Sequence, residues 1–278
     1  MPLSLTIRRM LSTQPVELPV FNPIAVKLQQ LLEMSAFTLD QVLTLINEDQ
    51  SLAGQILRMA NSVGYIGRVR VETIKDAVIR MGAQHVSNIA MATSQSGLHC
   101  SDSEVFKLFM QKLWSHSHAC AMGARWVAFN ANLASVAEQA YMAGLLHDVG
   151  KLYLLKALER LNRAGVAHAA LEEEMLLEIF AELHVEQGLR IMQHWNMPEI
   201  YCKAVAGHHA EPYDSEDLIL TIVRLVNAAC KVRGISVTPD PTIDILRLPE
   251  ARQLGLTTQM QLAELEVVIE DSLEIKIE

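Results

Sequence analysis

Long apolar runs are missing from this sequence. No run approaches the roughly 18 consecutive apolar residues that a membrane-spanning helix requires, and the apolar stretch at 218–226 is interrupted by Arg224. The apolar residues at the N-terminus form a segment that is too short and too broken for a signal peptide. These absences predict a cytoplasmic protein without membrane segments.

Paired cysteines are missing as well. The four cysteines are Cys100, Cys120, Cys202 and Cys230, and no two of them form a Cys-x-x-Cys pair. Their wide gaps do not have the spacing of a zinc ribbon. We therefore expect four free thiols in a reducing compartment.

Positive charge is scarce. Lys and Arg number 23 against 32 Asp and Glu, which gives a formal net charge of −9. Such a surface repels phosphate backbones unless basic residues cluster locally. The best local candidate combines Arg68 and Arg70 with Lys75 and Arg80, and acidic and neutral residues dilute it. Nucleic acid is therefore not an expected partner.

Aromatic residues and alternating patterns are the last absences. Aromatics make up 5% of the 278 residues, and no stretch shows a clean period of two. Leu, Ala, Met and Glu are common instead, and this balance favours helices over strands. With 50% hydrophobic and 20% charged residues, the chain can bury a sizeable core. The expected fold class is all-α, a compact multi-helix bundle.

Apolar residues recur at helical spacing along most of the chain. The expected helices cover 25–33, 52–60, 74–81, about 102–129, 134–146, 175–195 and 215–233. A further helix is expected after Thr38, where it includes the apolar run 42–46, and a last one begins near Thr258. Hydroxyl and carboxylate side chains are expected to cap their first turns. The expected caps are Thr38 with Gln41, Ser51, Thr73 with Asp76, Ser103 or Asp102, and Asp214 or Ser215, while Gly82 and Gly234 end two helices.

The adjacent pair His147 and Asp148 is the first candidate for chemistry. The residues before it are apolar, so the pair is expected to enter a buried setting. A buried carboxylate is costly unless a cation or several donors compensate it. An Asp beside a His is well suited to one or two divalent metals, and imidazole suits iron, zinc, manganese or nickel.

Further candidate ligands stand on separate segments: His116, His184, His208, His209 and Asn227. Taken singly, each has a plainer interpretation. A histidine on an apolar helix face is more often a hydrogen-bonded core residue, and Lys151 alone is usually a solvated charge. Asn227 alone is most often an amide bonded to backbone. Their joint order, with Gly-Lys following the His-Asp pair, is far more specific than any one of them.

Four of these segments together resemble the HD and HD-GYP phosphohydrolases. They read WSHS at 114–117, LLHDVGK at 145–151, HVEQG at 184–188 and HH at 208–209. The upstream half resembles the HDOD branch in particular. EDQSLAGQILRMANS at 48–62 is similar to its pattern DP.L...LL..ANS, TIKDAVIRMG at 73–82 to SI..AI..LG, and LGLT at 254–257 also fits. The resemblance runs from about Leu18 to near the C-terminus.

The resemblance implies a set of site residues. In HD-GYP enzymes the matching residues bind two or three metals, usually iron. Carried over, the metal ligands would be His116, His147, Asp148, His184, His208 and His209, with Asn227 at the last position. The catalytic set would be Asp148, Lys151 and His184. Lys151 would face the phosphate as a compact charge, and His184 or a member of the 208–209 pair would assist the leaving group.

Two departures separate the chain from the active enzymes. The last metal-binding Asp of the HD pattern is Asn227 here, and an amide oxygen brings no charge. The residues after His209 are Ala-Glu-Pro-Tyr, so the Gly-Tyr-Pro segment linked to cyclic-di-GMP hydrolysis is absent. Many HDOD proteins lack a competent site and act as signalling or scaffold modules.

Three functions follow from the resemblance. The first is a bacterial HDOD signalling module acting in trans on partner proteins. The second is a metal-dependent phosphohydrolase of a phosphate ester or signalling nucleotide. The third is a receptor that binds a nucleotide without hydrolysing it. Asn227 and the missing Gly-Tyr-Pro segment favour the first over the second.

Residues 1–17 are expected to be a loosely held leader, since Pro15 and Pro19 bound this segment. The resemblance implies that 18–275 form a single HDOD domain. It comprises an N-terminal helical half at 18–100, an HD-like half at 101–234 and a C-terminal helical extension at 235–278. Leu113, His116, Leu146, His147, Val223 and Asn227 are expected to surround one pocket, with His116 and Asp148 less than about 10 Å apart. Asn61 is expected to bond backbone at the end of its helix.

Overall fold

The computed structural model describes residues 22–34, 36–61, 70–163 and 173–274. Every regular element within these ranges is a helix, which confirms the all-α prediction. The expected leader at 1–17 and Arg68 of the diluted basic patch lie outside the described residues. Within the described ranges, no helix combines the length and apolarity needed to cross a membrane.

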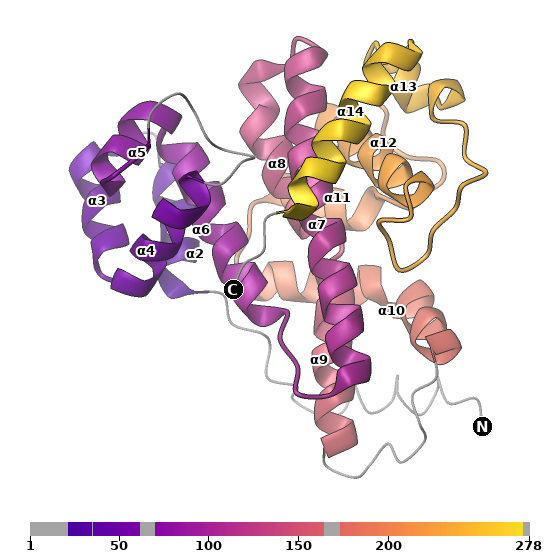
Figure 1. Ribbon diagram of the computed structural model, residues 1–278, viewed down its shortest axis with the longest axis horizontal. Helices are drawn as coiled ribbons and strands as arrows, with labels where there is room; N and C mark the ends of the chain where they lie inside the picture. The colour runs from indigo at the N-terminus through magenta and orange to yellow at the C-terminus, as the bar shows by residue number, and fades with distance from the viewer. Residues whose placement is uncertain (1–21, 35, 62–69, 164–172, 275–278) are drawn as a thin grey trace.

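The N-terminal half is a cluster of five helices, drawn in indigo and purple at one side of Figure 1. They are α2 (Pro23–Glu33), α3 (Leu39–Asn47), α4 (Gln50–Ala60), α5 (Ile74–Met81) and α6 (Ala83–Leu98). Helix α6 contacts α2, α4 and α5, and it also contacts α8 of the second half. It is therefore the element that joins this cluster to the rest of the molecule.

The second half is built around one long helix, α7 (Glu104–Asn130). Its partners are α8 (Ala137–Leu146), α9 (Val149–Arg163), α10 (Glu173–His194), α11 (Glu199–Gly207), α12 (Leu218–Val232), α13 (Pro249–Gln253) and α14 (Gln259–Asp271), with short 3-10 turns at 134–136, 245–247 and 272–274. Helix α7 contacts α8, α9, α12 and α14 directly. In Figure 1 it runs through the middle of the molecule beside them.

Several helix ends follow the expected cap chemistry. Thr38 and Gln41 form a reciprocal capping box at the start of α3, and Thr73 accepts from the Asp76 amide at the start of α5. Gly82 ends α5 with a φ of 85°, a conformation that costs an L side chain energy. Thr258 caps α14 in the same way as Thr38 caps α3.

Three other cap predictions are wrong. Helix α4 begins at Gln50, and Asp49 rather than Ser51 accepts from the Leu52 amide, at 3.0 Å. Helix α12 begins at Leu218, and its cap is Asp217. Neither Asp214 nor Ser215 has that role, because the helix starts three residues later than expected. Ser103 precedes α7 but makes no side-chain cap bond.

Asn61 confirms the expected role at the end of α4. Its amide nitrogen donates to the carbonyls of Leu57 at 2.8 Å and Val71 at 2.9 Å, and its oxygen accepts from the Val71 amide at 2.9 Å. The side chain thus links the last turn of α4 by hydrogen bonds to the backbone segment that leads into α5. Bonds to partly buried backbone groups contribute to stability because those groups would otherwise lack partners.

Glycines allow the helices of the second half to approach closely. A Cβ at Gly150 of α9 would lie 1.8 Å from the carbonyl oxygen of His184 on α10. A Cβ at Gly144 of α8 would lie 2.6 Å from the carbonyl oxygen of Cys120 on α7. Both contacts are with backbone, which cannot move aside. These two approaches bring α8 and the start of α9 against the helices that carry His116 and His184.

Candidate metal centre

His147 and Asp148 occupy the turn between α8 and α9. Helix α8 ends at Leu146 and α9 begins at Val149, so the two residues lie where the backbone changes direction. His116 lies in the middle of α7, and Lys151 lies in the first turn of α9. All four side chains are buried, with residue exposures of 5% or less. The prediction of a buried His-Asp pair is confirmed.

The remaining expected ligands come from three further helices. His184 lies in α10, His208 and His209 directly follow α11, and Asn227 lies in α12. His184, His208 and Asn227 are buried, whereas His209 is exposed. The histidines and Asp148 thus come from four parts of the chain, as the order of the motifs predicted, and Asn227 is buried on α12.

Four pocket histidines share the same ring orientation. In each, Nδ1 faces a backbone carbonyl oxygen: His116 that of Ile235 at 2.7 Å, His147 that of Gly144 at 2.7 Å, His184 that of Phe180 at 2.5 Å and His208 that of Val205 at 2.9 Å. A carbonyl oxygen only accepts, so Nδ1 carries the proton. In a neutral ring Nε2 then presents a lone pair to the pocket, which is the arrangement of metal-ligating histidines.

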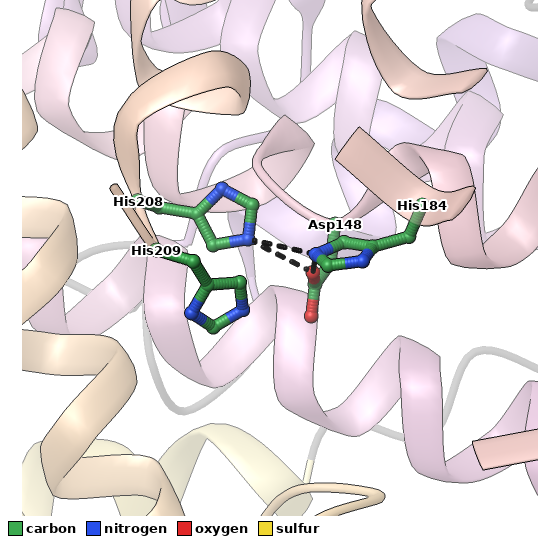
Figure 2. A group of neighbouring side chains, drawn as sticks. All are labelled: Asp148, His184, His208 and His209. Atoms are coloured by element: carbon green, nitrogen blue, oxygen red, sulfur yellow. Dashed lines mark hydrogen bonds and ion pairs between the residues drawn. The ribbon is translucent and has the colours of Figure 1, made fainter. Parts of the chain in front are cut away.

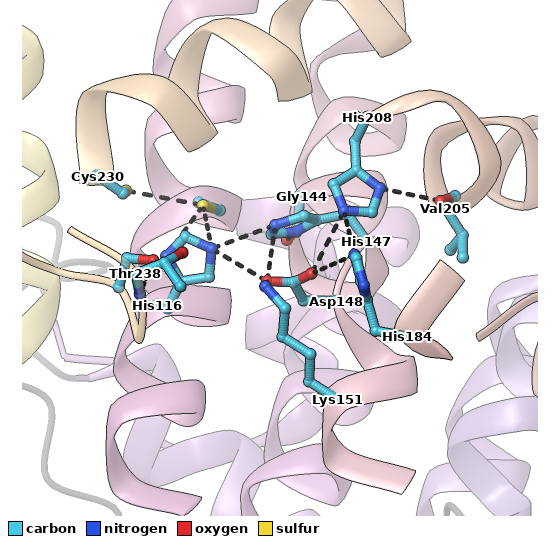
Figure 3. Close-up of polar contacts among 12 residues, drawn as sticks. His116, Gly144, His147, Asp148, Lys151, His184, Val205, His208, Cys230 and Thr238 are labelled. Atoms are coloured by element: carbon cyan, nitrogen blue, oxygen red, sulfur yellow. Dashed lines mark hydrogen bonds and ion pairs between the residues drawn. The ribbon is translucent and has the colours of Figure 1, made fainter. Parts of the chain in front are cut away.

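Two groups of donor atoms meet at Asp148 (Figure 3). On one side, His116 Nε2 lies 3.3 Å from His147 Nε2, and Asp148 Oδ2 lies 3.4 Å and 3.5 Å from these two atoms. We name this group the Oδ2 position. The carboxylate can therefore act from its two oxygens toward two separate sides.

On the other side, His184 Nε2 lies 3.3 Å from His208 Nε2. Asp148 Oδ1 lies 3.3 Å from His208 Nε2 and 3.8 Å from His184 Nε2. His209 completes this group, since one donor atom from each of the four residues lies within 4.8 Å of all the others. Figure 2 shows the three imidazoles around the carboxylate. We name this group the Oδ1 position.

These residues fit a divalent cation. Asp148 Oδ1 and Asn227 Oδ1 are buried and have no hydrogen-bond partner among the described residues. A metal–nitrogen bond of about 2.0–2.1 Å in a tetrahedral site places two nitrogens about 3.3–3.4 Å apart. The two Nε2–Nε2 separations of 3.3 Å match that spacing. A cation would satisfy the histidine lone pairs and Asp148 Oδ1 together.

Charge in the pocket is finely balanced. Burial alone would raise the pKa of Asp148, but Lys151 and His147 outweigh it and hold that pKa well below its usual value. The Lys151 ammonium donates to Asp148 Oδ2 at 2.6 Å. The carboxylate is therefore ionised at neutral pH, as metal binding requires.

The histidines divide into two kinds. Burial lowers the pKa of His147 well below its usual value and that of His184 to about 4. Burial also acts to lower the pKa of His116, but Cys120 and Asp148 outweigh it and raise the pKa to about 10. Without metal, the Oδ2 position thus holds one proton, which a cation must displace.

Arg224 is a supporting residue that sequence patterns did not single out for the site. One of its terminal nitrogens donates to the carbonyls of Gly207 at 3.2 Å and Ala210 at 2.9 Å, on either side of the two-histidine turn. Its Nε donates to Glu250 at 2.8 Å, and its guanidinium lies 3.9 Å from the centre of the Tyr213 ring. The only sequence signal is one arginine inside an apolar stretch.

The expected apolar lining of the pocket is buried, and so is the thiol of Cys120, which was not expected at the site. Leu113, Leu146 and Val223 all belong to the core. Cys120 Sγ lies 3.7 Å from His116 Nε2 and 3.7 Å from Cys230 Sγ. The four cysteines are free. His116 and Asp148, expected within about 10 Å, approach to 3.4 Å.

Comparison with known proteins identifies the family to which the chain belongs. The HDOD domain model matches residues 18–211, so the chain belongs to the HDOD family. A crystal structure of an HDOD domain protein from Geobacter sulfurreducens superposes with a TM-score of 0.77 at 20% identity, over 99% of each chain. A protein of Shewanella amazonensis SB2B, described as a proposed metal-dependent phosphohydrolase, superposes with a TM-score of 0.73 at 20% identity over 98% of each chain. At these identities the likeness concerns the fold.

A longer curated relative is also similar. An uncharacterized protein of Treponema pallidum is 23% identical over 254 residues, which cover 87% of this chain and 48% of the relative. The chain therefore spans about half the length of that relative.

Proposed function

We propose that this chain is a signal-transduction HDOD module whose buried pocket holds divalent metal and which acts on partner proteins in trans, in the cytoplasm. The observation that carries the proposal is the orientation of His184 and His208. Both direct Nδ1 at backbone and Nε2 toward the unpartnered Oδ1 of Asp148. Such an arrangement is stable with a cation among the three atoms and poorly compensated without one.

The metal ligands proposed are the ones that the resemblance implies. His116, His147 and Asp148 Oδ2 would hold one ion, and Asp148 Oδ1, His184, His208 and His209 a second. Asn227, whose buried oxygen lacks a partner, would add a neutral donor. Imidazole-rich sites suit iron, zinc, manganese or nickel. One or two ions are compatible with the donor set.

The signalling role is favoured by what the pocket lacks. Asn227 brings no charge where the active enzymes have an aspartate, and Ala210–Tyr213 replaces the Gly-Tyr-Pro segment. Asp148 is then the carboxylate that both metal positions share, since its Oδ2 lies near His116 and His147 and its Oδ1 near His184 and His208. A pocket with this charge would bind its metals more weakly, which suits occupancy that responds to conditions.

A second candidate function is a metal-dependent phosphohydrolase, and Lys151 is the observation that favours it. Its ammonium is buried within 2.6 Å of Asp148, where it would neutralise a phosphoryl oxygen. When bound, a metal supplies water of lowered pKa. Asp148 would help to orient that metal and its water. If His184 is not itself a ligand, it would assist the leaving group. The substrate class would be a phosphate ester or a signalling nucleotide.

One experiment separates these functions. The full chain, stripped of metal, is loaded with iron(II) or manganese(II) under anaerobic conditions and incubated with a panel of phosphate esters and cyclic dinucleotides. The signalling module predicts bound metal without turnover, while hydrolysis of any compound establishes the second function. Saturable binding without turnover identifies a nucleotide receptor. A chain that binds neither metal nor any compound contradicts the proposal, and Asp148→Asn is the matched negative control.

A further inference from the structure

Cys120 lies where a donor is needed at the Oδ2 position. It follows His116 by one turn of α7 and is fully buried. Its Sγ lies 3.7 Å from His116 Nε2. The sulfur, a nitrogen of His116 and a nitrogen of His147 all lie within 4.8 Å of one another. Three donors of metal-binding type therefore lie close together, on the side of Asp148 where Figure 3 shows His116.

Cys120 Sγ lies beside the His116 ring and not in front of its Nε2, since it is 3.7 Å from Nε2 and 3.9 Å from Nδ1. In a tetrahedral site with a metal–nitrogen bond of about 2.0 Å and a metal–sulfur bond of about 2.3 Å, the nitrogen and the sulfur lie about 3.5 Å apart on the lone-pair side of the ring. The separations from the two Nε2 atoms to Asp148 Oδ2, 3.4 Å and 3.5 Å, already suit such a site. Ligation by Cys120 therefore requires the thiol to turn about its Cα–Cβ bond, which ends its contact with Cys230.

The charge of the pocket gives the reason for a thiolate. Two divalent cations beside the buried Lys151 would share the one carboxylate of Asp148, whose Oδ2 lies near His116 and whose Oδ1 lies near His208. Uncompensated charge in a buried setting is expensive. Asn227 supplies no negative charge, whereas Cys120 can supply one when a metal binds. On binding, the S–H bond breaks, a metal–sulfur bond forms and the proton passes to solvent.

We propose that Cys120 is a metal ligand that completes the Oδ2 position with His116, His147 and Asp148, in place of the charge missing at Asn227. This inference rests on the proposed metal-binding function. The two positions then differ in their donor atoms. The Oδ2 position has one sulfur, two nitrogens and one oxygen, whereas the Oδ1 position has three nitrogens and one oxygen. Soft sulfur selects zinc or iron(II) over manganese. The Oδ2 position is therefore assigned to zinc or iron(II) rather than manganese.

Cobalt(II) tests the assignment because thiolate ligation gives it a charge-transfer absorption in the near ultraviolet. The metal-free full chain is titrated with cobalt(II) under anaerobic conditions, and the bound cobalt is counted. We expect the wild type to show the band with two bound ions. Cys120→Ser should lose the band and one ion, whereas Cys230→Ser and Cys202→Ser should keep both.

The outcomes distinguish this inference from the proposed function. Two bound cobalt ions without the band, or a band that survives Cys120→Ser, overturn the ligation by Cys120 and leave the metal centre intact. A band lost only in Cys230→Ser also overturns it. If no cobalt binds to the wild type, both proposals fail. X-ray absorption of the zinc-loaded wild type needs no variant, and a sulfur neighbour at about 2.3 Å is the expected result.

Discussion

His184 Nε2 lies 3.3 Å from His208 Nε2, although both rings hold their Nδ1 protons on backbone carbonyls. Two rings that are both neutral in this orientation cannot donate to each other, so two lone pairs would face each other beside Asp148. A cation between them would turn this repulsion into ligation. The arrangement depends on backbone contacts from α10 and α11, which fix the ring orientations before any metal arrives.

Asn227→Asp restores the charge of the HD pattern and should strengthen metal binding. We expect the dissociation constant to fall by on the order of tenfold, because affinity rises with the charge of the ligand set. Without metal, the same variant should melt at a lower temperature than the wild type, since it buries a second carboxylate. Isothermal titration and thermal melts measure both effects. Asn130→Asp, at the exposed end of α7, is the control. Equal metal affinity in all three proteins would rule out a metal-facing role for Asn227.

Gly150→Ala should damage both fold and site. The added Cβ would lie 1.8 Å from the His184 carbonyl oxygen, so α9 and α10 must separate. We expect a loss of about 3 kcal/mol or more in unfolding free energy, together with loss of bound metal. In Gly97→Ala, on α6, the new Cβ meets nothing within 4 Å, and stability should stay level or rise by about 0.5–1 kcal/mol. Denaturant unfolding compares the two, and similar effects would contradict the close-approach argument.

Arg224→Lys should release the turn that carries His208 and His209. A lysine cannot bond the Gly207 and Ala210 carbonyls and Glu250 together as the guanidinium does. We expect metal affinity to fall by about 10–100-fold, as for other residues that orient metal ligands. The loss should concern the Oδ1 position, so one ion should remain bound under mild conditions. Arg247 forms an exposed surface ion pair with Asp244, so Arg247→Lys should bind metal as the wild type does. An unchanged metal content in Arg224→Lys would show that the turn holds without it.

His99 should make stability depend on pH. Burial lowers the pKa of His99 to about 4, although the hydrogen bond from its Nδ1 to the Gln95 carbonyl oxygen acts to raise it. Because the unfolded chain has the higher pKa, near 6.5, it binds more protons below that pH. The stabilisation is therefore complete above pH 6.5 and falls as the pH drops toward 4. At pH 5 the loss is about 2 kcal/mol.

The matching variant is His99→Asn, which keeps a short side-chain donor near Gln95. Its unfolding free energy should fall less steeply than that of the wild type between pH 6.5 and pH 5. The difference between the two curves should be constant above pH 6.5. Parallel curves over the whole range would mean that His99 remains neutral in both states or charged in both.

The sequence was sufficient for the fold class and for bringing together His116, His147, Asp148, His184, His208 and His209. Helical spacing predicted most helices, and the order of the histidines predicted which ones meet. Four observed helices, α6, α9, α11 and α13, are absent from the expected set, and among them α9 carries Lys151. Gly150 in its first turn lowers helix propensity. That glycine serves the close contact with α10, and this use becomes visible only when the two helices are placed together.

The remaining misses have the same physical cause. Arg224 reaches Glu250 and the turn after α11, which lie 26 and 14–17 residues away along the chain. Cys120 and Cys230 are 110 residues apart and touch in the core. No local pattern connects such residues. The cap at Asp217 instead of Ser215 is a smaller miss, because several good cap residues stand together in Asp-Ser-Glu-Asp.

Metal content is the measurement that tests the central claim most directly. The full chain is purified under anaerobic conditions without chelators and is analysed for iron, zinc, manganese and nickel, next to a variant carrying His147→Ala and Asp148→Ala together. We predict between a fraction of one ion and two ions per wild-type chain and none in the variant, with further uptake when metal is added. A folded wild type that carries no metal and takes up none would contradict the account.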